Sequence, residues 1–319
     1  MATSSTITLA SGAARTLPPA DGIAGSNCGT PGVWRFTAAA PGPHVVLTAL
    51  IHGNEVCGAH ALWRVVQSPP TLARGTLTIV CCNLEAYARL DDATKGDRRF
   101  VDEDMNRVWG RLDGAPGAEA TYEVRRARTI WPWVQDADVL LDLHSMTSPA
   151  PALGLVGLAD KNVAFARVVG FPALLVRDAG HAAGLRLIDR QPFGDAAAAP
   201  AAMLVECGQH FSEEAFEAAE VAVTRTIAAV LDTNALPPAQ PQSVIEVTEA
   251  VTIRTPAFKF EREWPNMAVV PQAGTLLAHD GDQQVRTPYD NTYLVMPASS
   301  HHIKPGLTAV RLGRLVSSA

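Results

Sequence analysis

The stretch from His44 to Glu55, which reads HVVLTALIHGNE, decides the fold of this chain. Its first part, residues 44–51, is apolar and β-branched, a pattern that predicts a strand buried on both faces. Apolar residues then recur at the spacing of one helix face, at Val56, Ala59, Trp63 and Val66. Two prolines at 69–70 end this helix. A buried strand that leads directly into a helix is typical of an α/β sheet.

The same alternation of strand and helix continues to about residue 230. Apolar runs predict further buried strands at 76–82, 139–143, 153–158, 173–176 and 203–205. A helix is predicted over 119–137, and Ser212 is predicted to cap another helix whose apolar face continues to Val230. We therefore expect a mainly parallel, twisted α/β sheet flanked by helices.

The pattern changes after a proline-rich stretch at 236–241, LPPAQP, which we interpret as a linker. Short apolar runs between Pro and Gly turns then predict strands at 244–253, 267–270, 275–278 and 293–296. We expect two domains, an α/β domain over 1–236 and a small all-β domain over 243–319. Exposed apolar strands in the second domain are compatible with a homo-oligomer.

Composition excludes several classes of protein. The chain has 319 residues, of which 47% are hydrophobic and 18% charged, as in ordinary folded proteins. Its net charge of −6 and the lack of Lys/Arg runs argue against nucleic acid or an anionic membrane as a partner. Five cysteines without CxxC spacing argue against a disulfide framework. Neither a secretory leader at 1–15 nor a membrane-spanning apolar run is recognisable, so a cytoplasmic location is expected.

Three residues near predicted strand ends have the chemistry of a metal site. His52 and Glu55 follow the first strand, and His144 follows the apolar run at 139–143. The carboxyl ends of strands converge in α/β sheets, and residues three apart share one helix face. Two imidazoles and one carboxylate leave a fourth position open, as in catalytic zinc sites. The alternative is that His52 and Glu55 cap a helix and that His144 is an ordinary core histidine.

Two further features bear on catalysis. The polar stretch 97–107 combines arginines with Asn106, groups that bind carboxylates, although such a stretch can also be a solvated charge run. Glu206 ends an apolar strand, where desolvation would raise its pKa and suit it to proton transfer. The alternative for Glu206 is a structural carboxylate paired with an arginine or a helix terminus.

Four motifs occur in the order seen in one family. They are HGNE at 52–55, DMNR at 104–107, DLHS at 142–145 and VE at 205–206. Together they resemble the succinylglutamate desuccinylase/aspartoacylase family of zinc carboxypeptidase-like amidohydrolases. The resemblance spans about residues 44–210 and, more loosely, the C-terminal β domain. It implies a zinc carboxypeptidase-like sheet and one Zn²⁺ per chain.

The resemblance also implies roles for individual residues. The zinc ligands would be His52, Glu55 and His144. Glu206 would act as general base and acid, and Arg99 would polarise the scissile carbonyl. Asn106 and Arg107 would bind a carboxylate of the substrate.

Other roles implied by the resemblance have several candidates. Asp104 resembles the carboxylate that orients a zinc-bound histidine, and Asp142, on the strand face of His144, is a rival for this role. The family's arginine ahead of the catalytic glutamate could be Arg177, Arg186 or Arg190. Its tyrosine from the C-terminal domain could be Tyr289 or Tyr293, of which we favour Tyr289.

The implied function is zinc-dependent cleavage of the amide bond of a small, carboxylate-bearing N-acyl amino acid, by Glu-assisted attack of water. Two alternatives stay open. The same centre could release C-terminal residues from peptides as a zinc carboxypeptidase. The chain could also be a non-catalytic zinc-binding module, although binding alone would need neither Glu206 nor Arg99.

Overall fold

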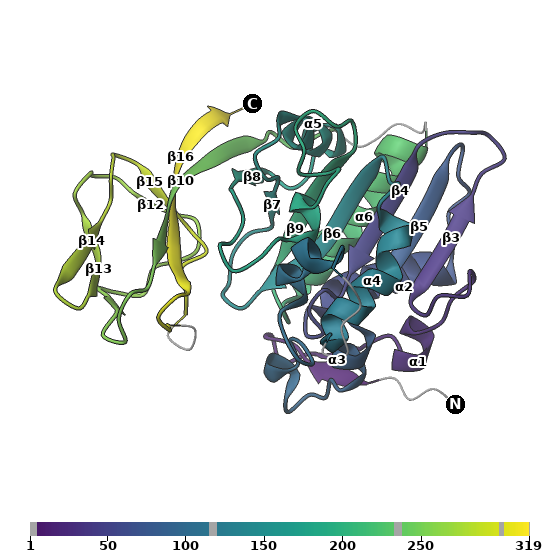
Figure 1. Ribbon diagram of the computed structural model, residues 1–319, viewed down its shortest axis with the longest axis horizontal. Helices are drawn as coiled ribbons and strands as arrows, with labels where there is room; N and C mark the ends of the chain where they lie inside the picture. Colours follow the sequence, from purple (N-terminus) through teal and green to yellow (C-terminus); the bar gives the residue numbers. More distant parts are fainter. Residues whose placement is uncertain (1–4, 115–119, 233–237, 300–302, 319) are drawn as a thin grey trace.

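A mixed sheet runs through the structure from one end to the other (Figure 1). The computed structural model describes residues 5–114, 120–232, 238–299 and 303–318. In these residues the sheet has 11 strands in the order β12-β15-β16-β10-β8-β7-β9-β6-β4-β5-β3. The strands are β3 (Val33–Thr37), β4 (His44–Ala49), β5 (Thr76–Cys81), β6 (Val139–Met146), β7 (Leu153–Leu155), β8 (Leu174–Arg177), β9 (Ala201–Gln209), β10 (Ser243–Thr252), β12 (Ala268–Val270), β15 (Thr292–Val295) and β16 (Thr308–Ser318).

The centre of the sheet is parallel, as predicted. β5, β4, β6 and β9 run side by side in the same direction, and β7, β8 and β10 also pair in parallel. β3 and β7 run against their neighbours β5 and β9, and the C-terminal strands pair antiparallel. The sheet is therefore mixed, and its parallel core brings the carboxyl ends of β4, β6 and β9 to one edge.

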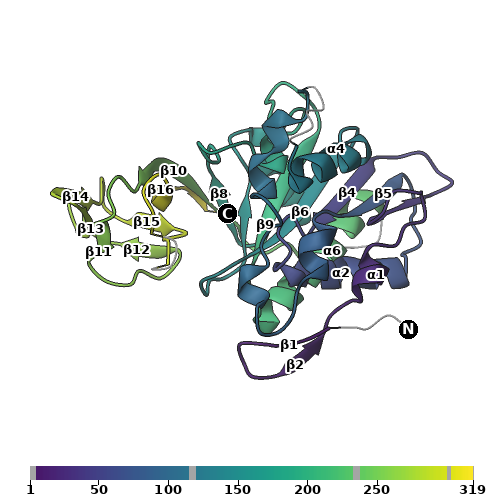
Figure 2. The ribbon, with the colours of Figure 1, turned by 60° about the horizontal axis from the view of Figure 1, so that its bottom comes forward.

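Helices cover both faces of this sheet (Figure 2). One face is covered by α2 (Val56–Gln67), α5 (Asp160–Val169) and α6 (Glu213–Leu231), and the other by α4 (Tyr122–Val134). The predicted cap of α6 is confirmed, because the Ser212 side chain accepts a hydrogen bond from the N–H of Ala215. Thr121 caps α4 in the same way through the N–H of Val124, so this helix begins later than predicted.

The remaining elements are short. They are β1 (Thr6–Thr8), β2 (Ala14–Thr16), α1 (Ala20–Ile23), α3 (Leu84–Ala88) and the 3₁₀ turns η1 (Lys95–Asp97), η2 (Met105–Arg107), η3 (Trp109–Arg111) and η4 (Leu187–Asp189). The turns η2, η3 and η4 lie on the α4 face of the sheet. No helix within the described ranges is both long and apolar enough to cross a membrane.

The C-terminal strands form a β unit at one end of the molecule (Figure 1). It adds a small sheet of β11 (Lys259–Phe260), β13 (Leu276–Asp280) and β14 (Gln283–Arg286). Its core includes Phe258, Trp264 and Leu277. β10 joins the two parts, because residues 243–246 pair with β8 and the whole strand pairs with β16. The domain division predicted near 236–243 stays a prediction, and residues 233–237 lie outside the described ranges.

Candidate active site

The group His52, Glu55 and His144, hereafter the His-Glu-His group, comes together at the carboxyl edge of β4 and β6. The two Glu55 oxygens lie 2.7 Å from His52 Nδ1 and 2.8 Å from His144 Nδ1. One potential ligand atom from each residue lies within 4.8 Å of the others. All three side chains are buried. The three residues predicted as metal ligands are therefore gathered around one point.

The turn between β4 and α2 brings His52 and Glu55 into this position. Leu50 has a positive φ of 60°, which non-glycine residues rarely adopt, and this turns the chain out of the strand. Gly53 leaves no space for a side chain, since a Cβ there would lie 2.6 Å from Ala86. Its N–H donates to the carbonyl of Arg99 at 2.9 Å. The glycine of the HGNE motif therefore allows the Arg99 loop to approach the His-Glu-His group closely.

Each histidine is held from behind by its own carboxylate. His52 Nε2 lies 2.9 Å from Asp104 Oδ1, and His144 Nε2 lies 2.9 Å from Asp142 Oδ2. Both nitrogens of each ring therefore face a carboxylate, with Glu55 at Nδ1 and Asp104 or Asp142 at Nε2. If Nδ1 coordinates a metal ion, Nε2 carries the proton that the second carboxylate accepts. Asp104 and Asp142 are therefore not rivals for one role, because each orients a different histidine.

The donor set fits a divalent metal ion. Burial alone would raise the pKa of Glu55, but the adjacent His52 and His144 hold it well below the usual range. The carboxylate is therefore ionised, and it lies between two imidazole rings in a buried site. Two nitrogen donors and one oxygen donor at this spacing suit zinc and related first-row metals.

Glu206 lies on the same face of the sheet as the His-Glu-His group. It is opposite His144 in the parallel pairing of β6 with β9. Its side chain is buried, and within the described residues its Oε2 atom has no hydrogen-bond partner. Burial, followed by the charge of Glu55, raises the pKa of Glu206 to about 8. Such a carboxyl group can exchange a proton near neutral pH.

Arg99 is close to this group as well. Its Nη1 donates to Glu55 Oε1 at 3.1 Å and its Nη2 to Asp104 Oδ2 at 3.3 Å. The loop that carries it is anchored by Glu123 of α4, which is fully buried and accepts the N–H groups of residues 101–103. The loop is thus fixed at its centre, between Arg99 and Asp104.

Asn106 and Arg107 lie in η2, next to Asp104. Asn106 Oδ1 accepts the backbone N–H of Leu187 at 3.0 Å, which ties η2 to η4. Arg107 Nη1 donates to the carbonyl of Asn106, and its Nη2 lies 3.7 Å from Asp104 Oδ2. Asn106 is therefore in part a structural residue, while the Arg107 side chain stays partly exposed.

The candidates for further substrate contacts differ in position. Arg177 pairs with Asp160 on the surface, and Arg190 reaches the carbonyl of Trp109. Arg186, in contrast, is buried close enough to Arg107 to affect its pKa. The Tyr289 hydroxyl lies 2.7 Å from Thr248 Oγ1 within the C-terminal β unit, and its substrate role stays a prediction.

Sequence reasoning missed three residues near this site. His210 lies 2.9 Å from the Ser145 hydroxyl through Nδ1, directly beside His144. Arg311 of β16 and Asp178 after β8 form a buried ion pair at 3.4 Å. The signal for Arg311 was present as a charged residue within the apolar strand sequence TAVRL at 308–312. An ion has to be paired or functional at such a position.

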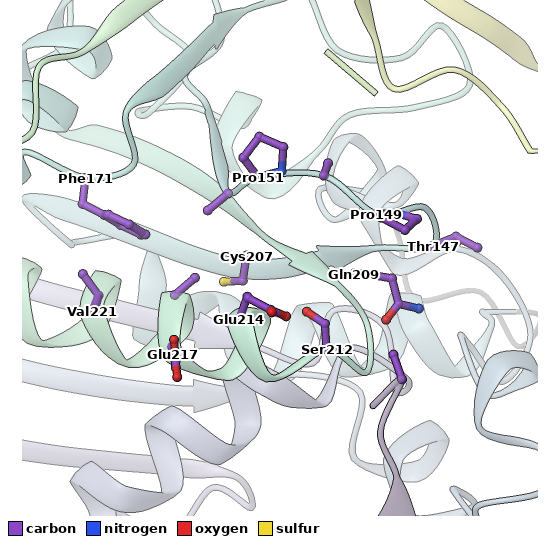
Figure 3. Close-up of a pocket in the computed structure, with 14 residues that line it drawn as sticks. Thr147, Pro149, Pro151, Phe171, Cys207, Gln209, Ser212, Glu214, Glu217 and Val221 are labelled. Atoms are coloured by element: carbon purple, nitrogen blue, oxygen red, sulfur yellow. The ribbon is translucent and has the colours of Figure 1, made fainter. Parts of the chain in front are cut away.

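A large cavity lies on the opposite face of the sheet (Figure 3). It measures about 850 Å³ and is lined by Cys207, Phe171, Pro151 and Val221, among others. Cys207 follows Glu206 directly on β9, and successive strand residues point to opposite faces. The cavity is therefore separated from the His-Glu-His group by the sheet, and it is not the candidate active site.

A buried His-Glu-His group at the carboxyl edge of an α/β sheet, with a glutamate beside it, is typical of metallohydrolases. The family model described as "Succinylglutamate desuccinylase/Aspartoacylase catalytic domain" matches residues 41–233. The chain therefore belongs to the succinylglutamate desuccinylase/aspartoacylase family of hydrolases, as its four motifs predicted.

Two curated proteins of the same name are similar to part of this chain. The human protein named N-acyl-aromatic-L-amino acid amidohydrolase (carboxylate-forming) is 32% identical over 112 residues, 33% of this chain and 34% of that protein. Its counterpart from Xenopus laevis is 31% identical over 116 residues, 34% of this chain and 36% of that protein. The chain thus matches about a third of the length of these curated relatives.

Two solved structures superpose on nearly the whole of this chain. Succinylglutamate desuccinylase from Vibrio cholerae superposes with a TM-score of 0.70 at 14% identity, covering 98% of this chain and 90% of that one. The enzyme of that name from Vibrio parahaemolyticus gives 0.67 at 17% identity, covering 99% and 92%. At this level of identity the likeness establishes the fold, including the C-terminal β unit.

Proposed function

We propose that this protein is a zinc-dependent amidohydrolase that cleaves the amide bond of a small, carboxylate-bearing N-acyl amino acid. The observation that carries the proposal is the convergence of the His-Glu-His group with Glu206 on one face of the sheet. Membership of the family, and the printed names of the relatives, support the same reaction.

His52, Glu55 and His144 would hold the zinc ion through two Nδ1 atoms and one carboxylate. Zinc bound there supplies a Lewis acid that polarises a carbonyl and lowers the pKa of water. With zinc held at the two Nδ1 atoms, Asp104 and Asp142 would accept the Nε2 protons and so fix the orientation of both rings.

Glu206 is the proton carrier in this proposal. Its unpartnered Oε2 accepts a proton from the attacking water, and the same carboxyl group then protonates the leaving amine. A pKa raised to about 8 suits both steps, since the group can take up and release a proton near neutral pH.

Arg99 and the η2 residues complete the site. The Arg99 guanidinium lies against Glu55 and would donate to the oxygen on which negative charge develops. Arg107 would bind the substrate carboxylate. Asn106 would assist through Nδ2, because its Oδ1 is occupied by Leu187. The products are a carboxylic acid and an amino acid.

The test is hydrolysis of a panel of N-acetyl, N-succinyl and N-formyl derivatives of acidic, basic, neutral and aromatic amino acids. Zinc-loaded and chelated protein are compared, with Glu206→Gln as the control that keeps all three metal ligands. We expect metal-dependent release of a free amino acid, and none from the variant. If no derivative is cleaved while zinc binds at one per chain, the proposal fails and peptides become the next substrates to examine.

The panel distinguishes the proposal from two alternatives, a zinc carboxypeptidase acting on peptides and a non-catalytic zinc-binding module. Peptide substrates would then distinguish these two from each other. A cytoplasmic location, a homo-oligomeric state and the lack of nucleic-acid or membrane partners also remain predictions. Size-exclusion chromatography with light scattering would measure the oligomeric state directly.

A further inference from the structure

Arg311 belongs to the C-terminal β unit, but its side chain faces the α/β part of the protein. In β16 its neighbours Val310 and Leu312 belong to the core of the β unit. Arg311 itself is opposite Val295 in the pairing with β15, and Val295 belongs to the core on the α4 face of the sheet. Successive strand residues point to opposite sides, so the Arg311 side chain points away from the core of the β unit and towards the α/β part. It is only 6% exposed there.

The Arg311 guanidinium contacts a histidine and a carboxylate. Its Nη2 lies 2.8 Å from His181 Nε2, and its Nε lies 3.4 Å from Asp178 Oδ2. Burial and the positive charge of the surrounding arginines lower the pKa of His181 to about 2, so the ring is neutral. Asp178 is shared, because its other oxygen lies 2.8 Å from Arg186 Nη2. Asp178 thus faces two buried guanidinium groups, and Arg186 also pairs with Asp189, whose Oδ2 lies 2.6 Å from Arg186 Nε.

Arg107 approaches the same point from η2. Gly184 packs so closely on Arg107 that a Cβ at position 184 would lie 2.2 Å from the Arg107 carbonyl oxygen. Burial lowers the pKa of Arg107, and repulsion from guanidinium groups that include Arg186 and Arg311 lowers it further. Three arginines therefore lie close together, and two of the three carboxylates that contact them are shared. Asp178 serves both Arg186 and Arg311, and Asp104 serves both Arg107 and Arg99.

One N–H group of the cluster formed by Arg107, Arg186 and Arg311 lacks a hydrogen-bond partner within the described residues. Arg186 Nη1 is buried and has no hydrogen-bond partner in the described parts of the chain. Leaving a buried donor without a partner is costly, and an anion from outside the protein would satisfy it. Glu206 is one of the groups whose charge affects the pKa of Arg311, so the arginines lie within electrostatic range of the candidate catalytic glutamate.

We propose that Arg311 is a specificity-determining residue that binds the substrate carboxylate together with Arg107 and Arg186. This inference rests on the proposed function. The C-terminal β unit then supplies a side chain to the active site, and substrate binding depends on the contact between Arg311 and the substrate carboxylate. Planar guanidinium groups bind a carboxylate in a bidentate manner, which a lysine cannot reproduce.

The test uses Arg311→Met and Arg311→Lys, with Arg314→Met as the matched control. Arg314 lies on the same strand, but it is exposed and pairs with Glu246 on the surface. Binding of N-acetyl amino acids and of their uncharged carboxamides is measured by calorimetry on zinc-free protein. Turnover of the same compounds is measured on zinc-loaded protein.

We expect Arg311→Met to weaken carboxylate binding about 10- to 100-fold and to raise KM more than it lowers kcat, since one charge-assisted pair is lost. Carboxamide binding should change little, and Arg311→Lys should be intermediate. An equal loss for carboxylate and carboxamide, or unchanged carboxylate binding, would overturn the proposal. If the native chain binds N-acyl amino acids through Arg311 but never cleaves them, only the proposed function fails.

Discussion

Replacing Glu123 with glutamine removes one of the two oxygens that hold the active-site loop. Oε1 accepts the N–H of Val101 at 2.7 Å and the Asn83 side-chain amide at 3.0 Å. Oε2 accepts the N–H groups of Asp102 and Glu103 at 3.1 and 3.2 Å. In Glu123→Gln an amide NH₂ replaces one oxygen and meets backbone donors, so two charge-assisted bonds are lost.

The size of the effect follows from these contacts. A hydrogen bond to a charged group contributes about 1.5–3 kcal/mol, and a buried unpaired donor costs a similar amount. We expect Glu123→Gln to lower the free energy of unfolding by about 3 kcal/mol. The loop also carries Arg99 and Asp104, so its release should weaken zinc binding as well as turnover.

Urea unfolding, hydrogen exchange of residues 101–103 and kcat/KM are measured on Glu123→Gln, with the exposed Glu217→Gln of α6 as the control. The exchange of the three amides should accelerate more than that of the core strands. A free energy of unfolding within about 0.5 kcal/mol of the native value, with unchanged exchange, would refute the reasoning.

Three further predictions concern the metal site. Asp104→Asn and Asp142→Asn should each weaken zinc affinity about 10- to 100-fold in competition with a chelating dye, because each carboxylate orients one ligand histidine; unchanged affinity in both would contradict this. Zinc added to chelated protein at about 1,000 times its Kd should stabilise it by about 4 kcal/mol, and His144→Ala should abolish this gain. Burial and then the charge of Glu55 raise the pKa of Glu206 from 4.5 to about 8, so the zinc-free protein should lose stability as the pH rises through that window. Glu206→Gln lacks this ionisation and should be more stable than the native chain by of order 4 kcal/mol at pH 8; a difference that does not vary between pH 5 and pH 8 would count against it.

Much of the fold could be predicted from local patterns. Buried strands of the parallel core are continuous apolar runs, so β4, β5 and β6 begin where the sequence indicates. The helix α5 and the strand β16 were not predicted. The apolar residues of α5 are mixed with Asn162 and Lys161, and β16 contains charged residues whose partners lie in other parts of the fold.

By itself, the sequence indicated the family and predicted the three residues of the His-Glu-His group as metal ligands. His52, Glu55 and His144 follow strands whose apolar pattern is local, and parallel topology makes the ends of such strands converge. Only the tertiary structure decided which carboxylate serves which ligand, with Asp104 behind His52 and Asp142 behind His144.

The Glu123 anchor and the buried Arg311 were likewise decided only by tertiary structure. In each case a charged side chain is placed against groups far away along the chain. Periodicity reports which face of an element is buried, but it carries no information on which distant element covers that face. The proposed carboxylate site depends on those distant pairings.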